Sequence, residues 1–213
     1  MTTASALNPL ARLNSQPRQP GEASFFWYDT QFKCEAVKVL PGEYFVDTVD
    51  LLITTTLGSC IAACLWDARA RVGGMNHFML PGGHADSGAA QMGRYGAYAM
   101  ELLINEMMRR GACRHSLEAK VFGGGQVVSG MDTINVGERN TQFVLSYLKA
   151  ERIPVVSQDV QGVVGRKVCF FPASGKALVK RLASTHNDTV LAQERVAARA
   201  ALAPAGAGSV ELF

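Results

Sequence analysis

The chain has 213 residues, of which 48% are hydrophobic and 18% are charged, and its formal net charge is +3. This length and composition suit one globular domain with tails and exclude a chain too polar to form a core. The small charge, without a basic run or a zinc-finger spacing, argues against a nucleic-acid-binding protein. No apolar segment approaches the ~18 residues of a membrane-spanning helix, so direct membrane insertion is not expected.

The N-terminal segment, residues 1–23, is expected to be a flexible arm. It holds Ser, Asn, Gln, Pro and Arg without a sustained period. It also lacks the charged start, apolar centre and cleavage site of a secretory signal. Five cysteines, an odd number scattered along the chain, do not form the pattern of a disulfide framework. We therefore expect a cytoplasmic protein.

The globular domain is expected between residues 24 and 183. Apolar and β-branched residues predict strands at residues 35–40 and 44–54, on either side of a turn at Pro41 and Gly42.

The second half of this domain is predicted to alternate helices and strands. Residues 88–110 carry apolar side chains at helical spacing and end at Gly111, a C-cap. Another helix is expected to begin at Asn140 as its N-cap, and residues 184–213 are expected to hold a peripheral helix and a tail. An α/β fold other than a doubly wound parallel sheet is indicated. Its further strands are predicted at residues 118–122, 155–160, 167–171 and 177–180.

A predicted hairpin between residues 60 and 80 is the most informative stretch. The apolar runs CIAACLW and VGGMNHFML flank a short charged connection, which is typical of a β-hairpin. If residues 67–70 form the loop, Trp66 faces Arg71 and Cys60 faces His77. Directly opposed residues share one face, with Cβ atoms roughly 4.5–5.5 Å apart, so this register would bring a thiol to an imidazole.

A cysteine beside a histidine predicts nucleophilic chemistry. An imidazole activates the thiol for attack on a carbonyl carbon. Gly58 and Ser59 precede Cys60, and backbone N–H groups there are expected to hold a developing oxyanion. The hydroxyls of the next residues upstream are available to orient the imidazole of His77, and strand physics alone does not choose among Thr54, Thr55 and Thr56.

Each of these residues also has a structural explanation. A free cysteine is often a small buried hydrophobe, and a histidine is often satisfied within its strand. Cys64 has the strand parity of Cys60, but positions four apart are separated by about 13 Å, too far for one metal ion to bind both thiolates. Cys64 is therefore predicted to be core, and no metal site is expected.

Glycines and charged residues further along the domain also have structural explanations. The run at residues 123–125 lacks the remaining residues of a phosphate-binding motif, so a tight turn or a close approach to the substrate backbone explains it better. Asp159 and Arg166 are polar residues beside turns, and ordinary salt bridges or caps explain them as well as substrate contacts do.

Several short motifs follow one another in order. They are TTTLGSC at residues 54–60, GGMNHFMLP at 73–81, AKVFGG at 119–124, VGERN at 136–140, and DVQG with GR at 159–166. Together they resemble the chemoreceptor glutamine deamidases, the CheD family, over roughly residues 44–181. The resemblance implies a layered sandwich of mixed, largely antiparallel sheets with helices packed outside.

The resemblance also implies an activity and its partners. The family deamidates glutamine side chains of bacterial chemoreceptors with a Cys-His-Thr triad, which maps here onto Cys60, His77 and Thr54, the threonine six residues before the cysteine. No metal or organic cofactor is implied. The expected partners are the cytoplasmic domains of chemoreceptors and a CheC-type chemotaxis phosphatase. Hydrolysis of receptor methyl esters is a secondary activity that the same thiolate allows.

Two other classes of function remain open on the sequence. One is a binding module that docks on receptors or on a chemotaxis phosphatase without catalysis. The other is a different cysteine amidohydrolase, a peptidase or a transamidase that uses the same pair of residues. A pull-down that is unaffected by Cys60→Ala would support docking, whereas scission of a peptide bond or incorporation of an amine would indicate the second class.

Overall fold

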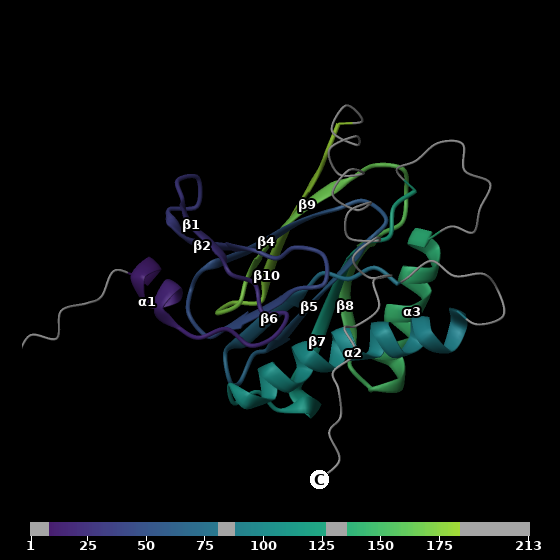
Figure 1. Ribbon diagram of the computed structural model, residues 1–213, viewed down its shortest axis with the longest axis horizontal. Helices are drawn as coiled ribbons and strands as arrows, with labels where there is room; N and C mark the ends of the chain where they lie inside the picture. The colour runs from purple at the N-terminus through teal and green to yellow at the C-terminus, as the bar shows by residue number, and fades with distance from the viewer. Residues whose placement is uncertain (1–8, 81–87, 127–135, 184–213) are drawn as a thin grey trace, which may run out of the picture.

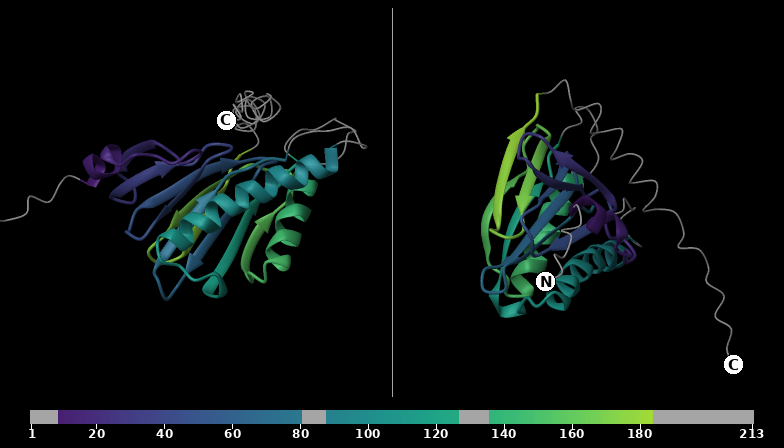
Figure 2. Two further views of the ribbon diagram at one scale, coloured as in Figure 1. Left: turned by 60° about the horizontal axis from the view of Figure 1, so that its bottom comes forward. Right: turned by 90° about the vertical axis from the view of Figure 1, so that its left-hand side faces the viewer.

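Three layers make up the fold, one of helices and two of β-sheet. The computed structural model describes residues 9–80, 88–126 and 136–183 (Figure 1). Helices α2 (Gly88–Arg109) and α3 (Val136–Ala150) lie on the outer face of one sheet, and the second sheet lies on its other face (Figure 2). In these described ranges, no helix combines the length and the apolar character needed to cross a bilayer.

Each sheet has five strands and mixes parallel with antiparallel pairs. The helix-covered sheet has the order β3-β6-β5-β7-β8 and the other has the order β1-β2-β4-β9-β10. Only β7–β8 and β2–β4 are parallel among the strand pairs of the described chain. The expected sandwich of mixed, largely antiparallel sheets is thus confirmed. The strands are β1 (Phe25–Asp29), β2 (Cys34–Lys38), β3 (Tyr44–Asp47), β4 (Leu52–Leu57), β5 (Ile61–Asp67), β6 (Val72–Asn76), β7 (Leu117–Gly123), β8 (Val155–Val160), β9 (Arg166–Phe171) and β10 (Lys176–Arg181).

Strand β5 is buried on both faces, and its side chains alternate between two cores. Ile61 and Ala63 pack with the helices, whereas Ala62 and Cys64 pack between the two sheets. This alternation follows from the two-residue period of a strand. Both faces of β5 therefore pack against apolar side chains, except at the ends of the strand. This is why the sequence shows an almost continuous apolar run here.

Most predicted elements are present, with one exception in the first half of the domain. The predicted strand at residues 44–54 is wrong, because β3 and β4 belong to different sheets. Strand β3 ends at Asp47, whose Oδ1 accepts hydrogen bonds from the backbone N–H groups of Thr48 and Val49 at 2.7 and 3.3 Å. Helix α2 matches its predicted range, and Gly111 follows it with φ +98° as a left-handed cap.

The described part of the N-terminal segment is packed, unlike the flexible arm expected at residues 1–23. Residues 9–15 form helix α1 (Pro9–Ser15), and Leu13 is 1% exposed in the core between the sheets. The Arg18 guanidinium lies 4.5 Å from the ring centroid of Phe26 and hydrogen-bonds Glu22. The helix expected within residues 184–213 lies outside the described residues. A short 3-10 turn, Arg114–Ser116, precedes β7.

Candidate active site

Strands β5 and β6 form the predicted hairpin, but their register differs from the prediction by two residues. Trp66 pairs with Gly73 and not with Arg71. The loop consists of residues 68–71, because Asp67 stays in the strand and its Oδ1 accepts two loop N–H groups at 2.8 and 3.1 Å. Arg71 closes the loop with φ +54°.

The observed register still leaves the cysteine and the histidine on one face. Ile61 pairs with Phe78, so His77 lies opposite Ala62 and is the diagonal neighbour of Cys60. A shift of two residues preserves the face of every side chain, whereas a shift of one would have reversed it. Diagonal neighbours lie within reach of a ring side chain. Cys60 and His77 are 0% and 2% exposed, so both belong to the interior between the sheets.

A threonine of the opposite sheet holds the ring of His77. Thr55 Oγ1 lies 2.8 Å from His77 Nδ1 and 2.7 Å from Val39 O. A hydroxyl has one proton, and here it is donated to Val39 O, so Nδ1–H donates to Thr55 Oγ1. His77 Nε2 then carries the lone pair, and it has no hydrogen-bond partner among the described residues. The ring therefore presents an unprotonated nitrogen, the form of a general base.

The surroundings of His77 keep it neutral. The pKa of His77 is lowered to about 4, chiefly by burial; the carbonyl of Val39 opposes this effect, and the positive charge of Lys38 adds a smaller lowering. Moving a charged imidazolium into a low-dielectric interior is unfavourable, which explains the direction. At neutral pH the ring is ready to accept a proton.

Thr54 does not make the contact expected of it. Its Oγ1 donates to Val168 O at 2.7 Å and lies 3.7 Å from Cys169 Sγ, on the outer face of β4. Thr55 points to the other face, which it shares with Ile53 in the core between the sheets. Neighbouring residues of a strand face opposite ways, so only one of the two hydroxyls reaches the imidazole. The orienting contact expected of Thr54 is made by Thr55.

Residues 58–60, the cysteine turn, connect β4 in one sheet to β5 in the other. All three carbonyl oxygens of this turn accept hydrogen bonds from outside it. Because C=O and the following N–H of a trans peptide point in opposite directions, these bonds also orient the N–H groups of Ser59 and Cys60 away from the donors. The three donors are Gly125 N to Gly58 O at 2.6 Å, Asn140 Nδ2 to Ser59 O at 2.8 Å and Gly124 N to Cys60 O at 2.7 Å.

Glycines allow residues 123–125, at the end of β7, to approach the cysteine turn this closely. Gly123 has φ +109°, and a Cβ there would lie 2.1 Å from Cys60 O. Gly124 has φ +65°, and a Cβ there would lie 2.1 Å from Thr141 Oγ1. Both positions need the left-handed region and have no room for a side chain. The expectation was a tight turn or an approach to a substrate backbone, whereas the structure shows residues 123–125 against the chain's own cysteine turn.

Arg166 has a larger structural role than its sequence context indicated. It is 2% exposed, and it forms an ion pair with Asp159 at 3.2 Å. Its guanidinium also donates to Gly123 O at 2.8 Å and to Gln161 O at 2.5 Å. Burial lowers the pKa of Arg166, and Asp159 opposes that effect. Arg166 thus holds the glycine residues that in turn hold the cysteine turn.

Asn140 was misassigned as a helix N-cap. It lies inside α3 and is 0% exposed. Its Oδ1 accepts from Leu80 N at 3.0 Å while its Nδ2 donates to Ser59 O. Asn140 precedes Val144 and Leu148 by four and eight residues, a spacing that places it on the buried face of α3, and sequence reasoning did not use that spacing.

Cys64 belongs to the core, as predicted. It is 1% exposed on the face of β5 that packs against the second sheet, and burial raises the pKa of its thiol. Across the ranges that the structure describes, no three His, Cys, Asp or Glu side chains are grouped to hold a metal ion.

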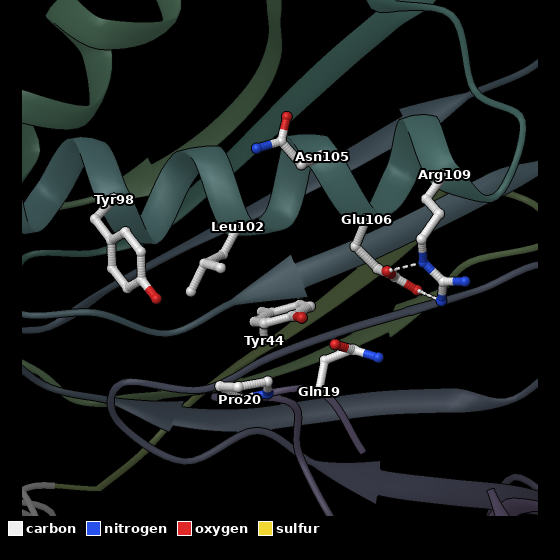
Figure 3. Close-up of a pocket in the computed structure, with 8 residues that line it drawn as sticks. All are labelled: Gln19, Pro20, Tyr44, Tyr98, Leu102, Asn105, Glu106 and Arg109. Carbon is white, nitrogen blue, oxygen red and sulfur yellow. Dashed lines mark hydrogen bonds and ion pairs between the residues drawn. The ribbon is translucent and has the colours of Figure 1, made fainter. Parts of the chain in front are cut away.

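A separate hollow lies along α2. It has a volume of about 300 Å³, and Tyr98 and Leu102 of the helix face Gln19 and Tyr44 across it (Figure 3). The carboxylate of Glu106 at its edge is already bonded to Arg109, as the dashed lines show. None of the predicted site residues lines this hollow.

Relatives of known name match almost the entire chain. A probable chemoreceptor glutamine deamidase CheD 1 of Albidiferax ferrireducens is 60% identical over 209 residues, which cover 98% of this chain and 88% of the relative. The chain belongs to the CheD family. A CheD protein of Methylobacillus flagellatus, also named a probable chemoreceptor glutamine deamidase, is 47% identical over 93% of this chain and its own full length.

Other comparisons cover less of this CheD-family chain. The family profile described as CheD chemotactic sensory transduction matches residues 79–181. A crystal structure of the Bacillus licheniformis hypothetical protein YfiH has a TM-score of 0.32 and 11% identity, over 56% of this chain and 49% of that chain. The latter likeness is too low to bear on fold or function.

Proposed function

We propose that this chain hydrolyses selected glutamine side chains of bacterial chemoreceptors to glutamate, with Cys60 as the nucleophile and His77 as the base. Relatives that match nearly the full chain carry the name chemoreceptor glutamine deamidase. The observation that carries the chemistry is the buried, unpartnered Nε2 of His77 on the face of the hairpin that also holds Cys60.

The first half of the reaction releases ammonia. His77 Nε2 takes the thiol proton of Cys60, and the sulfur attacks the carboxamide carbon of the glutamine. The oxyanion that forms is stabilised by backbone N–H groups of the cysteine turn, which the three carbonyl contacts orient. The protonated imidazole then gives its proton to the leaving nitrogen, so that ammonia departs and a thioester remains.

The second half regenerates the enzyme. His77, neutral again, takes a proton from water, which attacks the thioester carbon and forms glutamate. The sulfur leaves and recovers the proton from the imidazolium. Thr55 keeps Nδ1 protonated through both halves, so the same nitrogen, Nε2, always faces the reaction. No step requires a metal ion or an organic cofactor.

The proposal places the protein in the cytoplasm with the receptor domains it modifies. All five cysteines are free, which suits a reducing compartment. A carboxamide converted to a carboxylate adds a negative charge to the receptor surface. The same thiolate is proposed to hydrolyse receptor methyl esters, and a CheC-type phosphatase is proposed as a docking partner.

The decisive experiment uses a receptor cytoplasmic fragment and mass spectrometry. The wild-type protein is expected to produce the mass gain of amide-to-acid conversion at defined glutamines, and Cys60→Ala is expected to abolish it. Cys64→Ala is the matched control, because it removes a buried thiol four residues further along the chain, in the same core between the sheets. No conversion by the wild type, or equal conversion by Cys60→Ala, would refute the proposed chemistry.

The same assay distinguishes the alternatives. A protein that binds the receptor fragment without converting it, and does so equally well as Cys60→Ala, is a docking module. A shorter receptor fragment in the mass spectrum would indicate a peptidase, and incorporation of an added amine would indicate a transamidase.

A further inference from the structure

The β5–β6 ladder ends at the pair Cys64–Met75, and one further bridge, between Ile61 and Phe78, continues its register towards Cys60. Ile61 and Phe78 exchange both backbone hydrogen bonds, each 2.9 Å long. In an antiparallel pair the next hydrogen-bonded pair lies two residues further on, and here it would join Ser59 to Leu80. That pair is not made as the ladder would make it, because Leu80 N donates to the side chain of Asn140 at 3.0 Å.

The other group that the ladder would use is also bonded to Asn140. Ser59 O accepts from Asn140 Nδ2 at 2.8 Å. The side-chain amide of Asn140 thus bonds both Leu80 N and Ser59 O, two groups that the ladder would have joined directly. The direct bond from Leu80 N to Ser59 O is thus replaced at a point one residue before Cys60 and three residues after His77.

An amide meets both requirements with two separate atoms. Asparagine supplies a donor and an acceptor, whereas a carboxylate lacks the donor and an aliphatic side chain lacks both. Asn140 is 0% exposed, so water does not compensate for a lost partner. Helix α3 fixes its place, since Val144 and Leu148 on the same buried face pack into the core under the helices.

We propose that Asn140 is a positioning residue. It takes the place of the direct backbone bond from Leu80 N to Ser59 O and thereby fixes the position of the cysteine turn relative to His77. The proposal rests on the proposed function, because its effect is seen in that reaction. By holding Ser59 O, Asn140 turns the N–H of Cys60 towards the opposite side, and by holding Leu80 N it prevents the ladder from closing over the thiol. Asn140 touches neither substrate nor reacting atoms.

The test measures deamidation of a receptor fragment by the full chain carrying Asn140→Asp. The variant keeps the acceptor for Leu80 N and loses the donor to Ser59 O, so kcat is expected to fall by about 10- to 100-fold while KM stays close to the wild-type value. When the new carboxyl group is protonated it has an O–H that can donate to Ser59 O. The ratio of variant to wild-type kcat is therefore expected to rise as the pH is lowered.

Val144→Ala is the matched control, because it weakens the packing of the same helix one turn further on without touching the cysteine turn. It is expected to lower stability and leave kcat of the folded protein unchanged. The inference is wrong if Asn140→Asp retains wild-type kcat, or if its kcat ratio is independent of pH. Wild-type protein without activity would instead reject the proposed function.

A second pair of variants covers a failure of Asn140→Asp to fold. Asn140→Ser retains one hydroxyl that can donate to Ser59 O and accept from Leu80 N, whereas Asn140→Ala has neither group and nearly the same size. We expect the serine variant to have the higher kcat. Equal kcat values for the two would contradict the positioning role.

Discussion

The two partners of the proposed reaction are held in different ways. The cysteine turn is fixed through its backbone, by donors from the glycine segment and from α3 that together engage all three of its carbonyls. The ring of His77 is fixed through one side-chain contact, to Thr55, and its other nitrogen has no partner among the described residues. The cysteine turn is thus held by three donors from two other segments, whereas the imidazole is held through Nδ1 alone, by Thr55 Oγ1 at 2.8 Å and by the more distant Val39 O at 3.4 Å.

This difference predicts how each side fails. Losing the Thr55 contact at the ring should change catalysis more than stability, because Thr55 is the one side chain that orients the ring. Losing one contact behind the cysteine turn should change stability as well, because those bonds are buried and shared between elements.

The largest effect is expected from removal of the base itself. His77→Asn should lower kcat by about 10²- to 10⁴-fold, the range for loss of a general base, with little change in receptor binding. His115→Asn, which alters an exposed histidine in the turn before β7, is the matched control. Steady-state deamidation assays measure both, and a His77→Asn variant with near-wild-type kcat would show that another group takes the proton.

The buried histidine should also make stability depend on pH. The pKa of His77 is about 4 in the folded protein, whereas an unfolded histidine has a pKa of about 6.5. Between these values the unfolded chain binds more protons than the folded protein does. The contribution of His77 to stability is therefore fully present above pH 6.5 and is lost as the pH falls towards 4. The contribution is up to about 3 kcal/mol.

Denaturant unfolding of the wild type and of His77→Asn at pH 7 and pH 4.5 measures this contribution. The wild type should lose more of its free energy of unfolding than the variant, and the excess belongs to the histidine. Equal losses in the two proteins would mean that the ring is not buried in its neutral form.

On the other side of the site, Arg166→Met should lower the free energy of unfolding by about 2 kcal/mol, because two buried carbonyls lose a charged donor. Arg181→Met, which removes an exposed arginine that also pairs with Asp159, should change it by less than about 0.5 kcal/mol. Chemical denaturation measures both. A small effect of Arg166→Met would mean that the glycine residues hold their conformation without it.

The smallest effect separates two adjacent threonines. Thr55→Val removes the acceptor for His77 Nδ1 and should lower kcat by about tenfold, the value of one hydrogen bond. Thr54→Val removes an equally buried hydroxyl from the other face of the strand and should leave kcat nearly unchanged. Each variant leaves one backbone carbonyl without its hydroxyl donor, so their stabilities should be similar. The reverse order of kcat would restore Thr54 as the orienting residue.

Much of the ring side of the site could be predicted from the sequence, and much of the turn side could not. Strand parity placed Cys60 and His77 on one face, and it survived a register error of two residues because the period of a strand is two. The threonine was missed because spacing in a family does not reveal which face of β4 turns inward. That depends on where β4 begins, and the prediction had joined it to β3.

The backbone contacts behind the cysteine turn had no signal of their own. Gly124, Gly125 and Asn140 reach the turn from segments more than sixty residues away in sequence, and carbonyl acceptors are identical in every residue. The glycine run at residues 123–125 indicated a tight turn or a close approach, but the sequence did not show which part of the chain these residues contact. Such contacts become visible only when the sheets are assembled.

The most direct test of the account is to trap the thioester on Cys60. The enzyme is mixed with a receptor fragment, quenched in acid within one turnover and digested for mass spectrometry. We predict a covalent adduct between the peptide that contains Cys60 and a receptor glutamine residue that has lost ammonia, and no adduct with Cys60→Ala. Deamidation that proceeds at the normal rate while no adduct forms at any quench time would contradict the central claim that this sulfur attacks the substrate.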